Sequence, residues 1–151
     1  RLAIGDKLSW TGWIATAVGL LQAGENPDDY FNEVMIAGSH DRALRAVAAG
    51  LADGAAVDSL VYESTVQSEP SLARRLKVIA RSAPFSMPPV VVHPHLDPSL
   101  REQLRAALLT AHEDPAGREA LSRLGIDRFV VPDPRDYDGV RRGLHVWEAR
   151  R

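Results

Sequence analysis

The sequence predicts an α/β fold, with a mostly parallel sheet and helices on both of its faces. Short apolar runs alternate along the chain with longer stretches in which apolar residues recur at helical spacing. Residues that commonly begin helices follow several of the apolar runs, and glycine ends several of the helical stretches. This alternation is typical of parallel strands that are connected by helices.

The first part of the chain contains the clearest strand–helix units. In the first unit, the helix is expected to bury Ile14, Ala17, Val18 and Leu21, which fall on one face. Gly24 and other glycines at the ends of these stretches are typical helix stops. The three units pair residues 1–5 with 11–23, residues 33–37 with 39–50, and residues 54–57 with 60–68.

The rest of the chain is expected to add three strands and three helices. The strands are predicted at residues 76–80, 90–92 and 129–131, and the valine run at 90–92 suits a buried strand. Asp-Pro pairs at 97–98 and 114–115 are typical helix starts. A last helix is expected over residues 137–151, with Val140, Leu144 and Trp147 facing inward. Three prolines within residues 82–89 predict a crossing segment between two structural units.

Composition excludes several classes of protein. The 18 Lys and Arg residues are balanced by 20 Asp and Glu, and the net charge of −2 argues against a nucleic-acid partner. The absence of cysteine excludes disulfides, thiolate nucleophiles and cysteine metal sites. No apolar run is long enough to predict a membrane span. Because the chain begins at Arg1 rather than Met, we interpret it as a piece of a longer chain.

Small polar residues mark the three junctions where a strand ends and a helix begins. Ser9, Ser39 and Asp58 stand at these junctions. The carboxyl ends of parallel strands lie at one edge of a sheet, where ligands commonly bind. Helix starts there offer backbone N–H groups and a dipole that favours negative charge. The sequence therefore predicts a cleft for a small anion, with binding rather than catalysis as the function.

Each of these residues also has a purely structural interpretation. Ser9 and Thr11 could cap a helix, and Asp58 could cap the third one. His40 could be a solvent-exposed residue of a first helical turn, where the dipole disfavours the charged imidazole. An anion in the cleft would instead favour a protonated His40.

The residues also allow two other interpretations, an enzyme and a metal site. Ser9, His40 and Asp58 could serve as nucleophile, base and orienting acid, but Ser9 lies in no G-x-S-x-G motif. His93 and His95 would share one face of a strand, but a proline separates them and no third ligand lies nearby. We therefore expect no enzymatic activity, no metal and no cofactor.

Several motifs, taken in order, resemble one family of transport proteins. They are Ser9-x-Thr11-Gly12, Gly38-Ser39-His40-Asp41-Arg42-Ala43-Leu44, Ala56-Val57-Asp58-Ser59, and the stretches at residues 112–117 and 124–129. Over residues 1–142 the chain resembles the phosphate- and phosphonate-binding proteins of ABC importers, which have the type II periplasmic-binding-protein fold.

The resemblance implies a two-lobed protein with an interlobe cleft and a hinge. Residues 1–82 would form the second lobe, and residues 83–151 the hinge crossing and the return to the first lobe with its C-terminal helices. The N-terminal segment of the first lobe, which would supply the opposite wall of the cleft, is expected to be missing from this chain. The implied function is the solute-binding component of an ABC importer. The alternative is a ligand-sensing domain of a regulator or sensor with the same fold.

The resemblance also implies roles for individual residues and partners. The ligand would be a phosphate-like oxyanion or a phosphonate, and the other partners the membrane subunits of the transporter. A periplasmic or other extracytoplasmic location and a monomer are expected. Hydroxyl groups and backbone amides of one loop would hold the phosphoryl oxygens, His40 would reach the same group, and Asp58 would meet a donor on the ligand. The full set of expected ligand-binding residues is Ser9, Trp10, Thr11, Gly12, Trp13, Ser39, His40 and Asp58.

Overall fold

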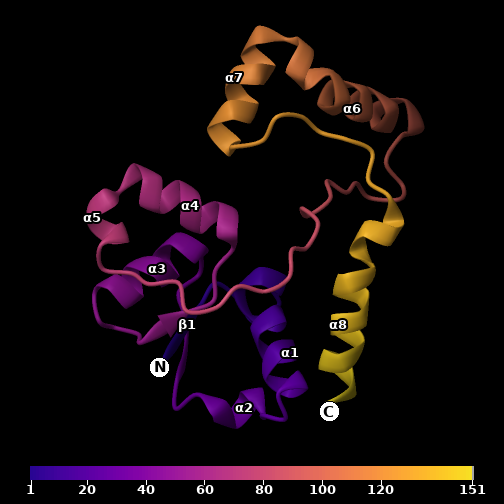
Figure 1. Ribbon diagram of the computed structural model, residues 1–151. Helices are drawn as coiled ribbons and strands as arrows, with labels where there is room; N and C mark the ends of the chain where they lie inside the picture. Colours follow the sequence, from indigo (N-terminus) through magenta and orange to yellow (C-terminus); the bar gives the residue numbers. More distant parts are fainter. Residues whose placement is uncertain (151) are drawn as a thin grey trace. The chain divides into compact units, whose positions relative to one another are not determined.

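The computed structural model describes residues 1–150, which form two compact units (Figure 1). The first unit contains Arg1–Pro84 and the C-terminal helix, and the second unit contains Phe85–Tyr137. The crossing predicted at residues 82–89 therefore lies at the unit boundary. The C-terminal helix belongs to the first unit, although the sequence grouped it with residues 83–151. The assignment of the two units to lobes stays a prediction.

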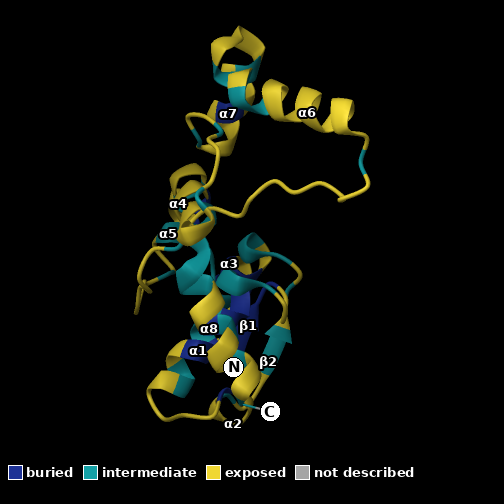
Figure 2. Ribbon diagram, turned by 90° about the vertical axis from the view of Figure 1, so that its right-hand side faces the viewer, coloured by how far each residue is buried: buried dark blue, intermediate teal, exposed yellow. Residues whose placement is uncertain are grey.

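A three-stranded parallel sheet forms the centre of the first unit. Its order is β2-β1-β3, with β1 at Leu2–Ile4, β2 at Val34–Ile36 and β3 at Gly54–Ala55. Leu2 lies opposite both Val34 and Gly54, so the two outer strands share one register on β1. Figure 2 shows that β1 is buried throughout. The predicted parallel α/β architecture is confirmed.

Helices cover both faces of this sheet because side chains alternate along β1. Leu2 and Ile4 lie on one face, in a core with the helical turn η1 (Trp10–Ile14), helix α1 (Ala15–Gln22) and helix α8 (Asp138–Ala149). Leu144 and Trp147 of α8 pack against that core, as predicted. The short helix α2 (Pro27–Tyr30) precedes β2.

The other face is covered by helix α3 (His40–Ala48). Ala3 is fully buried against the alanines of α3, Ala43 and Ala46, and small side chains here allow a close approach of helix and strand. Helices α4 (Ser59–Ser68) and α5 (Pro70–Ala73) pack on α3 in a second layer. Arg45 of α3 donates to both carboxylate oxygens of Glu69, over 2.8 and 2.5 Å, which ties α3 to the start of α5.

The second unit contains the predicted helix pair. The helical elements of this unit are α6 (Pro98–Thr110), the turn η2 (Ala111–Glu113), α7 (Pro115–Leu124) and the turn η3 (Pro134–Tyr137). The side chains of Asp97 and Asp114 each accept a backbone N–H of the helix that follows, so both predicted helix starts are confirmed. Helix α6 contains no buried residue (Figure 2).

The strands predicted at residues 76–80, 90–92 and 129–131 are wrong, because none of these segments has strand structure. Val90, Val91 and Val92 are 61%, 79% and 42% exposed, so the predicted buried strand is instead an open segment. A strand needs a neighbour that accepts its ladder hydrogen bonds, and residues 1–150 offer these segments none. Apolar runs alone could not supply that information.

Candidate functional site

The first strand–helix junction is closed by Ser9. Its hydroxyl oxygen accepts the backbone N–H of Gly12 over 3.1 Å, and its carbonyl oxygen accepts the N–H groups of Trp13 and Ile14, both over 3.0 Å. The helix therefore begins with one wide turn of π type, which residue spacing did not indicate. Ser9 fixes the loop that presents Thr11.

The second junction brings His40 over the end of β1. Gly38 has a φ of +85°, a left-handed conformation that favours glycine, and its N–H donates to the carbonyl of Gly5 over 3.1 Å. This turn leads directly from β2 into α3. Ser39 takes an extended conformation before the helix, and its hydroxyl makes no capping bond to the helix amides.

The side chain of His40 connects all three junctions. Its Nε2 lies 3.3 Å from the Thr11 hydroxyl, and its Nδ1 accepts the backbone N–H of Asp58 over 3.3 Å. Because that amide can only donate, these partners assign the imidazole proton to Nε2, which donates to Thr11. The starts of η1, α3 and α4 thus meet at one imidazole ring. We call Ser9, Thr11, Gly12, His40 and Asp58 the junction cluster.

Two hydroxyl groups of the junction cluster keep their hydrogen atoms for an outside acceptor. Ser9 Oγ accepts from Gly12, and Thr11 Oγ1 accepts from His40. A hydroxyl oxygen has one hydrogen to donate and can accept as well, so each of these groups remains able to donate. Gly12 allows this close arrangement, since a Cβ there would lie 2.9 Å from Ser9 Oγ and 3.4 Å from His40 Cε1.

Two carboxylates lie at the same helix starts, and each has a local partner. Asp58 caps α4 by accepting the N–H of Leu60 over 2.9 Å. The Ser39 hydroxyl donates to Asp41 and holds the pKa of that carboxyl below its usual range.

The two tryptophans of the predicted loop have structural contacts. Trp13 is only 4% exposed and meets Trp147 edge to face at 6.1 Å. The six-membered ring of Trp10 lies against Gly143 of α8. The amides of Gly12 and Trp13, expected to face the ligand, both donate to Ser9. In this conformation the hydroxyl groups, rather than these two amides, are the donors that remain.

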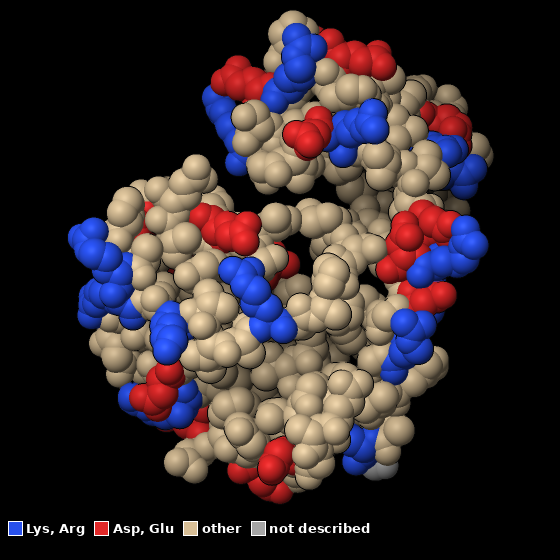
Figure 3. Space-filling view, in the orientation of Figure 1, with Lys and Arg blue, Asp and Glu red and all other residues tan. Residues whose placement is uncertain are grey.

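The junction cluster does not stand out from the rest of the surface by an excess of positive charge. The junction cluster contains no lysine or arginine, and on the face shown in Figure 3 basic and acidic side chains are interspersed within each unit. Among residues 1–150, no group of three or more His, Asp or Glu side chains is placed to hold a metal ion. His93 and His95 make only a local contact, in which the His95 N–H donates to His93 Nδ1 over 3.2 Å.

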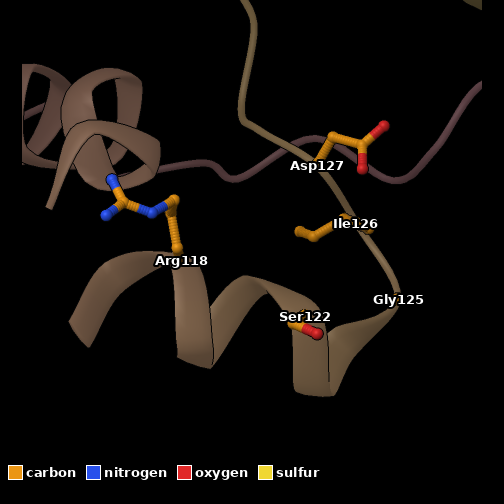
Figure 4. Close-up of a pocket in the computed structure, with 5 residues that line it drawn as sticks. All are labelled: Arg118, Ser122, Gly125, Ile126 and Asp127. Atoms are coloured by element: carbon orange, nitrogen blue, oxygen red, sulfur yellow. The ribbon is translucent and has the colours of Figure 1, made fainter. Parts of the chain in front are cut away.

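A separate pocket lies in the second unit, beside the end of α7 (Figure 4). Arg118, Ser122, Gly125, Ile126 and Asp127 line about 390 Å³ of space. The guanidinium of Arg118 donates to the carbonyls of His112 and Glu113 over 3.2 and 2.9 Å, so it closes the preceding helix end. None of the residues predicted to bind a ligand belongs to this pocket.

Comparison with known proteins agrees with the resemblance drawn from the motifs. The family model described as "ABC transporter, phosphonate, periplasmic substrate-binding protein" matches residues 1–137. The structure of XAC2383 from Xanthomonas citri, bound to chloride ion, is similar in fold, with a TM-score of 0.66 at 22% sequence identity. The match covers 99% of this chain and 58% of that one. Among residues 1–150, no helix is both long and apolar enough to cross a membrane. The chain belongs to the family of periplasmic substrate-binding proteins of phosphonate ABC transporters.

Proposed function

We propose that this chain is part of the solute-binding component of an ABC importer, and that the junction cluster binds a phosphate-like oxyanion or a phosphonate. The protein would act outside the cytoplasm as a monomer and deliver its ligand to the membrane subunits of the transporter. Membership of the family supports the transport role. The ligand and its mode of binding are argued from the junction cluster.

The observation that carries the proposal is the pair of hydroxyl groups on Ser9 and Thr11. Both oxygens accept from protein donors, and both hydrogens remain for a ligand. A tetrahedral oxyanion has several lone pairs on each oxygen and accepts such bonds strongly. The dipoles of the helices that begin here add favourable potential for negative charge. Binding therefore requires no lysine or arginine.

The carboxylate of Asp58 favours one kind of oxyanion over another. It lies at the start of α4, and its backbone N–H is bound to His40. A carboxylate beside a fully ionised anion is repelled, unless the ligand carries a hydrogen that the carboxylate can accept. Phosphate and alkylphosphonates have such a hydrogen at neutral pH, aminophosphonates offer an ammonium group as well, and sulfate has neither. We therefore expect sulfate to bind more weakly than phosphate.

An anion in a protein of similar fold also supports this class of ligand. XAC2383 is described as bound to chloride ion, although its sequence is only 22% identical. Chloride carries the negative charge of an oxyanion without its shape.

The test is an NMR titration of the chain with inorganic phosphate, methylphosphonate, 2-aminoethylphosphonate and sulfate. It detects dissociation constants up to the millimolar range, so weak binding is measurable. Thr11→Val and Ser9→Ala each remove one hydroxyl. A hydrogen bond to a charged group contributes about 1.5–3 kcal/mol, so each variant is expected to bind about 10- to 150-fold more weakly.

The matched control is Thr110→Val. The Thr110 hydroxyl donates to the carbonyl of Ala106 within α6, in the second unit. This variant should leave affinity unchanged. If Thr11→Val and Ser9→Ala bind as tightly as the parent chain, the junction cluster is not the binding site.

A further inference from the structure

A long stretch of the chain contains basic but no acidic residues. Residues 70–96 include no Asp or Glu, although the whole chain has a net charge of −2, and they include four cations, Arg74, Arg75, Lys77 and Arg81. We call residues 74–81 the basic segment. We propose that the basic segment is a docking surface for anionic phospholipid headgroups. This inference rests on the proposed function, because a solute-binding protein delivers its ligand at a membrane.

The turn that ends α5 holds the first three cations on the surface. Leu72 is buried, and Leu76 packs against the same core cluster. The N–H of Arg75 donates to the carbonyl of Leu72 over 2.9 Å, which closes the turn. Arg74 and Lys77, like Arg75, are exposed. The two leucines therefore anchor the turn while these three residues, which we call the turn cations, remain in solvent.

No acidic side chain neutralises the turn cations. Among residues 1–150, none of the three forms an ion pair. The carboxylate of Glu69, at the start of α5, is held by Arg45 of α3. The carboxylate of Glu63 in α4 lies 3.7 Å from Arg81. The three positive charges are therefore available to an anion outside the molecule. Figure 3 shows basic side chains beside α5 and along the segment that follows it.

Apolar side chains follow the turn cations directly. Val78 is 39% exposed and Ile79 is 88% exposed. The surface of an anionic bilayer suits both kinds of group, since its phosphates attract the cations and its interface takes up apolar side chains. An acidic protein surface would satisfy the charges but would gain nothing from Ile79. The combination of charges and apolar neighbours therefore favours phospholipid.

The basic segment is separate from the junction cluster. Helix α4 begins at Asp58 of the junction cluster, and α5 follows the other end of α4 (Figure 1). A helix of ten residues is about 15 Å long. A ligand at the junction cluster and a headgroup at the turn cations would therefore not compete for the same groups.

The test is co-sedimentation of the chain with vesicles. They are made either of phosphatidylcholine alone or of equal parts of phosphatidylcholine and phosphatidylglycerol. Each Lys or Arg near an anionic membrane strengthens binding about fivefold, so the four cations predict half-maximal binding at about 2 mM mixed lipid. The triple variant Arg74→Gln/Arg75→Gln/Lys77→Gln should bind about 100-fold more weakly. Salt should release the parent chain, because the Debye length falls from about 10 Å at about 0.1 M to about 3 Å at about 1 M.

The matched control is Arg101→Gln/Arg105→Gln/Arg123→Gln. It removes the same charge from α6 and α7, where these arginines lie 3.8, 3.9 and 2.6 Å from a glutamate oxygen. This variant should bind mixed vesicles as tightly as the parent chain, and circular dichroism checks that both triple variants are folded. An equal loss of binding in the two variants would overturn the proposal, because net charge rather than the basic segment would then be responsible.

Two further arms separate phospholipid from an acidic protein. Ile79→Ser should weaken vesicle binding several-fold, because an apolar side chain no longer enters the interface, and should leave binding to polyglutamate unchanged. Vesicle binding that is unaffected by Ile79→Ser would overturn phospholipid as the partner. Binding to polyglutamate that is as tight as binding to the mixed vesicles would do the same.

The remaining outcomes separate this proposal from the proposed function. No binding to mixed vesicles, or equal binding to phosphatidylcholine alone, would overturn the docking surface. The phosphate titration is repeated with the triple variant of the turn cations, which should bind phosphate like the parent chain. Phosphate binding without vesicle binding would refute the docking surface alone. Vesicle binding without phosphate or phosphonate binding would refute the proposed ligand site alone.

Discussion

Two helical glycines allow a sharp test of how α8 packs in the first unit. Gly143 in α8 faces Trp10, and a Cβ there would collide with Cη2 of the indole and lie 3.2 and 3.3 Å from Cζ3 and Cζ2. Gly19 in α1 is exposed, and a Cβ there would meet no atom within 4 Å. The same Gly→Ala change should therefore have opposite effects at the two sites.

The magnitudes follow from these surroundings. Replacing glycine by alanine within a helix stabilises it by about 0.5–1 kcal/mol, and both variants share this gain. Only Gly143→Ala must also displace a rigid indole ring, and overpacking of this kind costs about 1–3 kcal/mol. Gly19→Ala should be more stable than the parent chain, and Gly143→Ala less stable by about 1 kcal/mol. The difference between the two variants isolates the contact with Trp10.

The assay is urea unfolding followed by tryptophan fluorescence and by circular dichroism. Trp10, Trp13 and Trp147 are the three tryptophans of the chain, and all lie in the first unit, so fluorescence reports on that unit alone. Gly143→Ala can change the fluorescence of Trp10 directly. Circular dichroism follows the loss of helix instead, so it shows whether the stability itself has changed. Equal stabilisation by Gly143→Ala and Gly19→Ala would refute the packing of α8 against η1.

Three further predictions concern individual contacts. Hydrogen bonds from Arg45 lower the pKa of the Glu69 carboxyl, so this pair should stabilise the fold above the ordinary glutamate pKa of about 4.3 and lose that effect as pH falls. Glu69→Gln should thus be less stable than the parent in urea at pH 7 and equal to it near pH 3; a constant difference would contradict the ion pair. Gly125 ends α7 with a φ of +69°, so Gly125→Ala should lose about 1 kcal/mol by circular dichroism and Gly125→Asn less. Asp114→Ala removes the cap on Gly117 and should cost about 1 kcal/mol, whereas an unchanged midpoint would show that the cap is dispensable.

The sequence predicted the elements that depend on local signals. The three strands at residues 2–4, 34–36 and 54–55 follow from short apolar runs that end in polar junctions. Asp97 and Asp114 were correctly assigned as helix starts, and the capping role that was the alternative interpretation of Asp58 is also present, because a cap needs only the residues of its own turn. The parallel arrangement of the strands also predicted that the three strand–helix junctions lie close together, because the carboxyl ends of parallel strands share one edge of the sheet.

Features that depend on distant residues could not be predicted. The ring of Trp10 lies against Gly143, and no local pattern connects residues so far apart in the chain. The two hydrogen bonds of His40 require partners from two other segments, so its position was predicted but its bonding was not. Val90–Val92 has the composition of a strand, but composition cannot show whether a neighbouring strand exists.

The central place of β1 has a consequence for the order of folding. Residues 2–4 provide the backbone partners of both β2 and β3, which do not pair with each other. Neither outer ladder can form before this segment is extended and in place, so residues 2–4 act as the template for both outer strands. A cleavage or a bulky fusion that disturbs these few residues would separate both outer strands at once.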